Sequence, residues 1–305
     1  MKISDNSNTA GPEVRGFFDP VTATWTYVVW AEGAANKKCA IIDSVLDYDA
    51  ASGRTSTASA DKVAYFVQSK GLQVEWILET HIHADHLTAS CYLKENLGGK
   101  SAISAHILDV LKTWQPIFHN EADTPMDGSQ FDHLFKDDET FSIGALEARI
   151  IHTPGHTPAD TTYIIASAKA PEYTSAAERG GAVFVGDAMF LPDVGTGRCD
   201  FPGGSAVDSY NSTRKLLALP DNYRMYIGHD YPEGKGRAAQ CMAYISEQKA
   251  SNILAAAAAE KDTFVKSRAD SDKNKPMPEL LLPSLQVNLR GGVLAQYIKI
   301  PVNTL

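Results

Sequence analysis

The chain has 305 residues, of which 44% are apolar, and it carries a formal net charge of −9 at pH 7. That length suits one large domain, or two small ones, with a sizeable core. The negative charge, and the lack of any run rich in lysine and arginine, argue against a nucleic-acid partner, because phosphates need a basic surface.

The N-terminal segment and the apolar runs indicate where the protein works. Residues 1–15 are polar and mixed, without the pattern of a signal or transit peptide. The run of small apolar residues at 254–259 is far too short to cross a membrane. We therefore expect a cytoplasmic protein that does not bind membranes.

Short periodic segments predict an alternation of strands and helices. Runs of β-branched and apolar residues predict strands at 26–30, 39–42, 74–78, 102–104, 147–152, 182–185 and 224–227. Apolar residues at helical spacing predict helices at 61–69, 87–97, 106–114, 207–219 and 238–259, with Ser205 and Asp208 in a capping box for the fourth. Polar stretches predict a surface loop at 170–180 and a linker at 267–278. This order indicates an α/β layered fold.

The four cysteines lie far apart and form no C-x-x-C pair. This disfavours both a thiolate zinc site and a disulfide scaffold. Cys39 falls in a strand pattern, and Cys91 and Cys241 fall in helical patterns, so these three are expected to be inert small hydrophobes. Cys199 lies in the segment 195–201, which is considered separately below.

The segment from Thr80 to His86 follows an apolar strand and contains three histidines and an aspartate, namely His81, His83, Asp85 and His86. Imidazole and carboxylate groups bind borderline divalent metals, and a loop at a strand end can turn several of them inward. A solvated polar loop is the alternative. The spacing differs from the His-Glu-x-x-His of a zinc-binding helix. We therefore predict a metal site built on a loop.

Three later strands also end in metal-type ligands. His156 follows the strand at 147–152, Asp187 follows the strand at 182–185, and His229 follows the strand at 224–227. Chance would rarely place all of these side chains at strand ends. The pattern predicts that they meet the histidine cluster in one site at the edge of a sheet.

The motifs occur in an order that resembles the metallo-β-lactamase superfamily. They are His-x-His-x-Asp-His at 81–86, Thr-Pro-Gly-His at 153–156, Gly-Asp at 186–187 and Gly-His-Asp at 228–230. The resemblance spans roughly residues 27–231. It implies an αββα sandwich formed by a single domain at 16–262, with a C-terminal extension at 263–305 packed on the same domain.

One branch of that superfamily is favoured by a second motif. Class B β-lactamases usually have a cysteine where Asp187 stands, and RNA-processing members are disfavoured by the acidic charge. The segment Gly-Thr-Gly-Arg-Cys-Asp-Phe at 195–201 is similar to the persulfide dioxygenases, also called sulfur dioxygenases, and to a bacterial branch of them. Glyoxalase II, a zinc-dependent thioester hydrolase, is the second candidate. A non-catalytic sulfur-binding module is the third.

The resemblance implies a metal and a reaction. One Fe²⁺ per chain would be bound by His81, His156 and Asp187, and glutathione persulfide, or a similar small persulfide, would be oxidised by O2 to sulfite and thiol. The remaining candidate ligands would then lie around this ion or hold a second metal; they are His83, Asp85, His86 and His229. Zn²⁺ is the alternative metal. Whether the chain forms a homodimer or works with a rhodanese partner is left open.

The resemblance also implies a substrate site. Arg198 and Tyr231 would contact glutathione, since a guanidinium offers paired donors to a carboxylate. Alternatively, Arg198 holds its own loop through Asp200. Cys199 would gain thiolate character from the neighbouring guanidinium and be open to modification. Its alternative is a small residue that fills space under the loop.

Overall fold

The structure of the chain is a computed structural model, which describes residues 11–33, 36–120, 122–167, 180–256 and 258–302. All but the last residue of the predicted surface loop at 170–180 lies outside the described residues. Among the described residues, no helix is long and apolar enough to cross a membrane.

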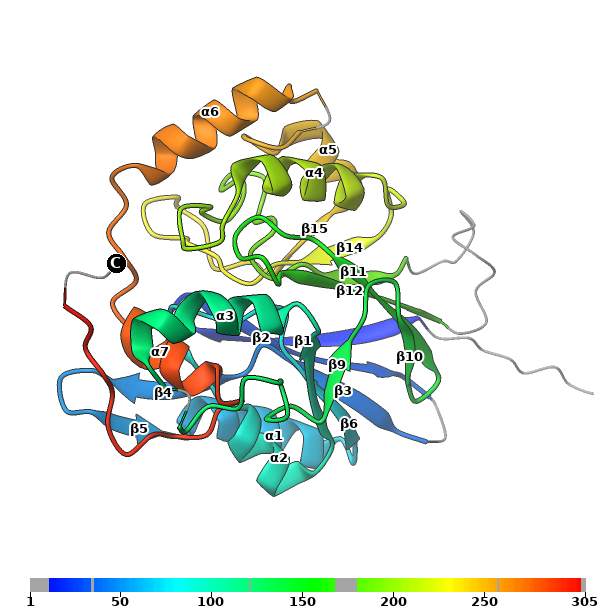
Figure 1. The fold of residues 1–305 in the computed structure, drawn as a ribbon. Helices are drawn as coiled ribbons and strands as arrows, with labels where there is room; N and C mark the ends of the chain where they lie inside the picture. Colours follow the sequence, from blue (N-terminus) through cyan, green and yellow to red (C-terminus); the bar gives the residue numbers. More distant parts are fainter. Residues whose placement is uncertain (1–10, 34–35, 121, 168–179, 257, 303–305) are drawn as a thin grey trace, which may run out of the picture.

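Two six-stranded sheets form the centre of the molecule (Figure 1). The first has the order β1 (Pro12–Asp19), β2 (Thr24–Ala31), β3 (Lys38–Ile42), β6 (Gln73–Leu78), β8 (Lys100–Ser104) and β9 (His133–Phe135). The second has the order β10 (Thr140–Ile143), β11 (Leu146–His152), β12 (Thr161–Ser167), β13 (Ala182–Phe184), β14 (Arg224–Tyr226) and β15 (Met242–Tyr244). A small third sheet joins β5 (Arg54–Ser56), β4 (Val45–Asp49) and β7 (Leu87–Thr88).

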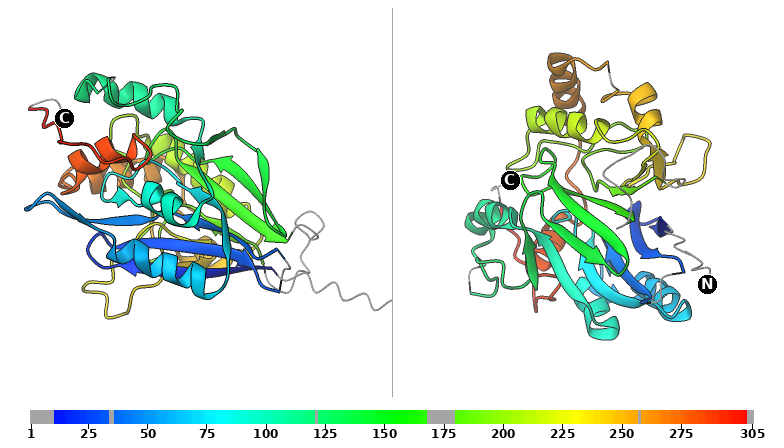
Figure 2. Two further views of the ribbon diagram at one scale, coloured as in Figure 1. Left: turned by 90° about the horizontal axis from the view of Figure 1, so that it is seen from below. Right: turned by 90° about the vertical axis from the view of Figure 1, so that its right-hand side faces the viewer.

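Helices cover the outer faces of both sheets (Figures 1 and 2). They are α1 (Ala58–Ser69), α2 (Ser90–Leu97), α3 (Ile107–Phe118), α4 (Ala206–Leu217), α5 (Ile245–Ser251), α6 (Lys261–Asp272) and α7 (Leu281–Asn288). Apolar side chains of α1 and α2 pack on the first sheet, and those of α4, α5 and α6 pack on the second. The predicted αββα sandwich is therefore confirmed.

Side chains of β2 point alternately to the two faces of the sheet, so this strand contributes to two separate apolar clusters. Tyr27 and Val29 face the other sheet, where they join Phe135 and Phe184 in the central cluster. Val28 lies between them in sequence and packs on the opposite side, against α1 and α2. Side chains of a strand alternate between its two faces, so a strand covered on both faces is apolar throughout.

Two predicted helices differ from the structure because strand pairing outweighs helical spacing. The predicted helix at 238–259 is wrong, since its start is β15, whose Met242 pairs with Tyr226 of β14. Cys241 accordingly lies beside a strand, where its carbonyl accepts a hydrogen bond from the Tyr27 hydroxyl. The predicted helix at 87–97 begins only at Ser90, because Leu87 pairs with β4.

The predicted linker at 267–278 is helical in its first half, as the end of α6. Arg268 and Asp272 are buried and joined by an ion pair of 2.5 Å at i,i+4 spacing. Two charged side chains of an otherwise largely exposed helix can therefore be buried, because they neutralise one another. Helix α6 lies against α4, and α7 lies against β7.

Candidate metal centre

Four turns at one end of the two sheets bring the predicted ligands together. The turn after β6 carries His81, His83, Asp85 and His86, and the turns after β11, β13 and β14 carry His156, Asp187 and His229. All are buried except Asp85, which is partly exposed. Their ligand atoms form two neighbouring groups, in each of which all atoms lie within 4.8 Å of one another.

The first group consists of His81, His156 and Asp187. Nε2 of His156 lies 3.6 Å from Oδ2 of Asp187. Nε2 of His81 and Oδ1 of Asp187 are buried without a hydrogen-bond partner. Leaving such atoms unpaired costs about 1–3 kcal/mol each, and a bound cation would remove that cost. The donor set of two imidazoles and one carboxylate fits Fe²⁺ or Zn²⁺.

Hydrogen bonds fix the tautomers of both histidines in this group. Nδ1 of His156 lies 2.7 Å from the carbonyl oxygen of Arg198, which can only accept, so Nδ1 carries the proton. The Thr80 hydroxyl donates to Asp43 Oδ2 at 2.8 Å, so it accepts from Nδ1–H of His81 at 3.0 Å. Each Nε2 therefore presents a lone pair to the site, as a metal ligand must.

Electrostatics favour the neutral form of His81. Burial lowers the pKa of His81 well below its usual value, and the neighbouring His83 and His156 lower it further. A neutral imidazole is the form that binds a metal. His81 is therefore ready to coordinate at neutral pH.

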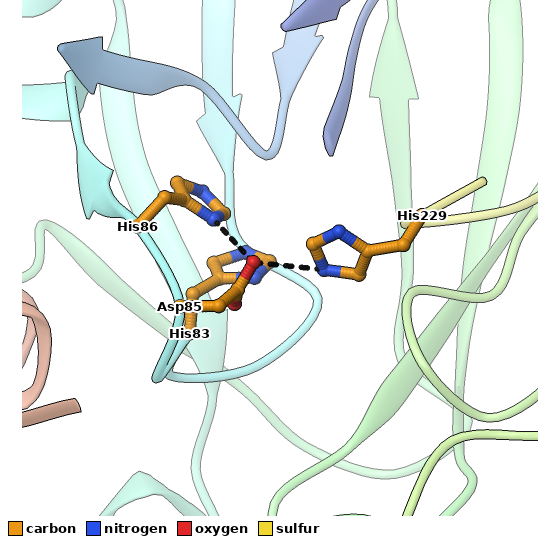
Figure 3. A group of neighbouring side chains, drawn as sticks. All are labelled: His83, Asp85, His86 and His229. Carbon is orange, nitrogen blue, oxygen red and sulfur yellow. Dashed lines mark hydrogen bonds and ion pairs between the residues drawn. The ribbon is translucent and has the colours of Figure 1, made fainter. Parts of the chain in front are cut away.

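The second group consists of His83, Asp85, His86 and His229 (Figure 3). Asp85 lies between two of them, with Oδ2 at 3.3 Å from His229 Nε2 and 3.5 Å from His86 Nδ1. Nε2 of His229 is also 3.4 Å from Oδ1 of Asp187. Asp187 thus turns one oxygen to each group.

His83 differs from the other histidines because its Nε2 faces two buried acids. It lies 3.1 Å from Asp43 Oδ1 and 3.3 Å from Glu79 Oε2. Burial lowers the pKa of His83, but the two carboxylates outweigh burial and raise it well above its usual value. Glu79 was not predicted as a site residue; the available signal was a carboxylate at the end of an apolar strand, directly before the Thr-His pair.

Glycines stand where the ligand loops pass closest to one another. Gly186 has a φ of +50°, and a Cβ there would lie 2.4 Å from Thr80 Oγ1. A Cβ on Gly228 would lie 2.6 Å from Asp187 Oδ1. The glycine in each of the motifs Gly-Asp and Gly-His is therefore required by the close approach of the neighbouring loop.

A cleft of about 1440 Å³ opens onto both groups. Its lining includes His156, Asp187 and His229 from the metal centre, two of the predicted substrate residues, Arg198 and Tyr231, and also Phe201; the third, Cys199, is not in the lining. Tyr231 is 44% exposed and stacks on His229, with ring centroids 6.2 Å apart. The structure therefore brings Arg198 and Tyr231 to the mouth of the metal centre.

The guanidinium of Arg198 is already engaged. It makes two hydrogen bonds to Asp200, of 2.6 and 2.7 Å, and a third of 2.7 Å to the carbonyl of Pro276. It also lies over the ring of Phe201, 4.7 Å from its centroid. This geometry is that of the alternative role, in which Arg198 holds its own loop.

Cys199 has the opposite electrostatic character from the one predicted. Burial raises the pKa of its thiol to about 12. The expected thiolate is disfavoured because Asp200 neutralises the adjacent guanidinium of Arg198, and because Asp272 accepts the backbone N–H of Cys199 at 2.9 Å. The raised pKa favours the alternative role, in which Cys199 is a small residue that fills space under its loop.

Comparison with known proteins gives matches along the whole chain. A model of the metallo-beta-lactamase superfamily matches residues 19–170. A probable metallo-hydrolase of Burkholderia pseudomallei is 45% identical over 299 residues, which are 96% of this chain and 99% of that protein. Glyoxylase B2 of Dictyostelium discoideum is 46% identical over 307 residues, which are 98% of this chain and 99% of that protein.

More distant matches carry a different name. The mitochondrial persulfide dioxygenase ETHE1 of Bos taurus is 27% identical over 96% of this chain and 94% of that protein. The crystal structure of ETHE1 from Myxococcus xanthus is 26% identical, with a TM-score of 0.69 over 92% of this chain and 100% of that chain.

Proposed function

Because this chain belongs to the metallo-beta-lactamase superfamily, we propose that it is an iron-dependent persulfide dioxygenase. Its substrate is glutathione persulfide or a similar small persulfide. Persulfide, O2 and water give thiol, sulfite and two protons, and four electrons pass from the persulfide sulfur to dioxygen. The alignment with ETHE1 over nearly the whole chain supports this proposal.

The proposal rests mainly on how the histidines are partnered: His83 faces two acids, whereas the residues of the first group face one another. His83 is held by Asp43 and Glu79, so the group of His81, His156 and Asp187 is left as a set of two imidazoles and one carboxylate. Three ligands would not fill the coordination sphere of an Fe²⁺ ion, so an ion held by these residues would have positions open. Bound Fe²⁺ supplies electron transfer to dioxygen, which Zn²⁺ does not, since zinc undergoes no redox change.

The chain's own residues orient and protect this set. The Arg198 carbonyl holds His156, and the Thr80 hydroxyl holds His81, each with Nε2 toward the ligand position. The ligand side chains are buried, and the cleft admits the substrate and the water that the reaction consumes from the side of Tyr231.

A zinc-dependent thioester hydrolase of the glyoxalase II type is the second candidate, and the second ligand group favours it. Nε2 of His86 is buried without a hydrogen-bond partner, and Nε2 of His229 is buried close to the carboxylates of Asp85 and Asp187. Two metals a few ångströms apart activate a water for hydrolysis. The similar proteins named glyoxylase B2 and probable metallo-hydrolase also favour this candidate.

Two assays on anaerobically purified protein separate the candidates. Oxygen uptake with glutathione persulfide, together with about one iron per chain, supports the dioxygenase. Release of thiol from S-lactoylglutathione without oxygen, by protein that holds zinc, supports the hydrolase. A chain that does neither is the non-catalytic sulfur-binding module. The Asp187→Ala variant is the blank for both assays.

A further inference from the structure

One corner of the cleft gathers charged side chains of both signs. The loop that carries Arg198 lies against the end of α6 and the segment after it, where Arg268 and Lys275 are found. Two acids, Asp200 and Asp272, lie in the same corner. Glu279 also lines the cleft, so three cations face three acids here and the formal charge of the corner is zero, in a chain whose net charge is −9.

The two arginines of the corner use their donors within the protein. Arg198 donates to Asp200 and Pro276. Arg268 is buried; its Nε donates to Asp272 at 3.0 Å, and its Nη1 donates to the carbonyl of Thr196 at 3.0 Å. Neither guanidinium therefore has a free pair of N–H donors for a ligand.

Lys275 is different. Its side chain is 42% exposed and lines the cleft, and its Nζ lies 3.5 Å from Asp272 Oδ1. That oxygen already accepts from Arg268 Nη2 at 2.5 Å. An ammonium has three donors, so Lys275 has capacity for a further acceptor. Burial is the main reason that the pKa of Lys275 is lowered; Arg268 and Arg198 lower it further, whereas Asp272 raises it.

Arg198 connects this corner to the metal centre by hydrogen bonds. The carbonyl of Lys275 accepts from Arg198 Nη2 at 3.4 Å, and the carbonyl of Arg198 accepts from Nδ1–H of the metal-site residue His156 at 2.7 Å. A ligand lying along this wall of the cleft would have its sulfur near the metal site and its far end near Lys275. Met277 and Leu280 line the cleft close by in sequence and offer apolar contact to the ligand's backbone.

We propose that Lys275, rather than Arg198, binds a carboxylate of the thiol that carries the persulfide sulfur. This inference rests on the proposed function, because it takes the ligand to be a small acidic thiol. Arg198 is then a positioning residue, which holds the segment 275–276 and the ring of His156 in place.

The test is a binding measurement that does not depend on turnover. S-Methylglutathione, which lacks a reactive sulfur, is titrated by calorimetry into metal-loaded wild type, Lys275→Ala, Lys275→Arg and Lys273→Ala. Lys273 is an exposed lysine two residues away and is the matched control. We expect Lys275→Ala to weaken binding about tenfold, as for a lost hydrogen bond between charged groups. Lys275→Arg and Lys273→Ala should bind within about twofold of wild type.

A second ligand checks the chemistry. The diethyl ester of S-methylglutathione carries no carboxylate, so Lys275→Ala should not weaken its binding further. Equal binding of S-methylglutathione by wild type and Lys275→Ala, or an equal loss in Lys273→Ala, overturns the role of Lys275 and leaves the proposed function standing. If wild type itself does not bind S-methylglutathione, both the role of Lys275 and glutathione as the carrier are wrong.

Discussion

Nε2 of His83 lies 3.1 Å from Oδ1 of Asp43, and this contact separates His83 from the histidines on either side of it in the motif. His81 has a lowered pKa and an unpartnered Nε2, whereas His83 has a raised pKa and two acidic partners. The motif His-x-His therefore contains one candidate metal ligand, His81, and one histidine, His83, that faces two buried acids.

Removal of a ligand from the first group should remove the metal. We expect His156→Ala and Asp187→Ala to retain less than about a tenth of the wild-type iron, because each change deletes one of three ligands. Iron is measured by plasma mass spectrometry after anaerobic purification. His133→Ala is the control, since His133 is a partly exposed histidine paired with Glu139 and belongs to none of the candidate metal groups. Full iron content in Asp187→Ala would mean that the second group holds the ion.

His83→Ala should separate stability from metal binding. The change leaves Asp43 and Glu79 buried without their cation, and we expect the free energy of unfolding to fall by about 3 kcal/mol. Iron content should stay close to one per chain. Urea unfolding and metal analysis of the same sample check both points. A stable variant without iron would show that His83 is itself a ligand.

Arg198 and Asp200 should behave as one unit. Arg198→Lys cannot reproduce the paired hydrogen bonds, so we expect KM to rise more than kcat falls. Asp200→Asn should have the same effect, and the double variant should be no worse than either single one. If Arg198 contacted substrate directly, Asp200→Asn would free its guanidinium and lower KM instead.

Asp160 should make the metal-free protein less stable as the pH rises. Burial raises the pKa of its carboxyl to about 6, so the folded state binds this proton more tightly than the unfolded state does. Its unfavourable ionisation develops between about pH 4 and pH 6. We expect Asp160→Asn to raise the free energy of unfolding by up to about 3 kcal/mol at pH 8, and to have little effect at pH 4. An equal effect at both pH values would contradict the raised pKa.

Cys199 should be slow to react. A thiol of pKa about 12 is ionised to on the order of one part in ten thousand at pH 8. We expect alkylation by iodoacetamide, followed by peptide mass spectrometry, to be on the order of a thousandfold slower than for a free thiol of ordinary pKa. Cys199→Ser should keep iron and turnover. Loss of turnover with iron intact would place the thiol in the chemistry.

The parts that were predictable from the residues depend on local patterns. The strand ends that carry His81, His156, Asp187 and His229 are marked by apolar runs that stop at a ligand or a glycine. The sandwich and the convergence of these ligands follow from those runs, because parallel strands such as β13 and β14 bring their ends to one edge.

The parts that were not predictable depend on contacts between distant segments. Strand β15 is set by its pairing with β14, which helical spacing in 238–259 does not reveal. Asp43 contacts His83 across 40 residues of chain, and it acts together with Glu79, which is only four residues before His83. Arg198 has Asp200 two residues away, and only the fold decides between that partner and a ligand.

The carboxylate of Asp187 makes the two ligand groups interdependent, since its oxygens lie 3.6 Å from His156 Nε2 and 3.4 Å from His229 Nε2. A dication in either group would repel a second one in the other, and by reciprocity each would weaken the other by the same factor. The positions should therefore fill in sequence as the metal concentration rises. Protein produced in a zinc-rich medium would then hold more metal than the proposed reaction needs. Its metal content would depend on the zinc supply and would not identify the metal that takes part in the reaction.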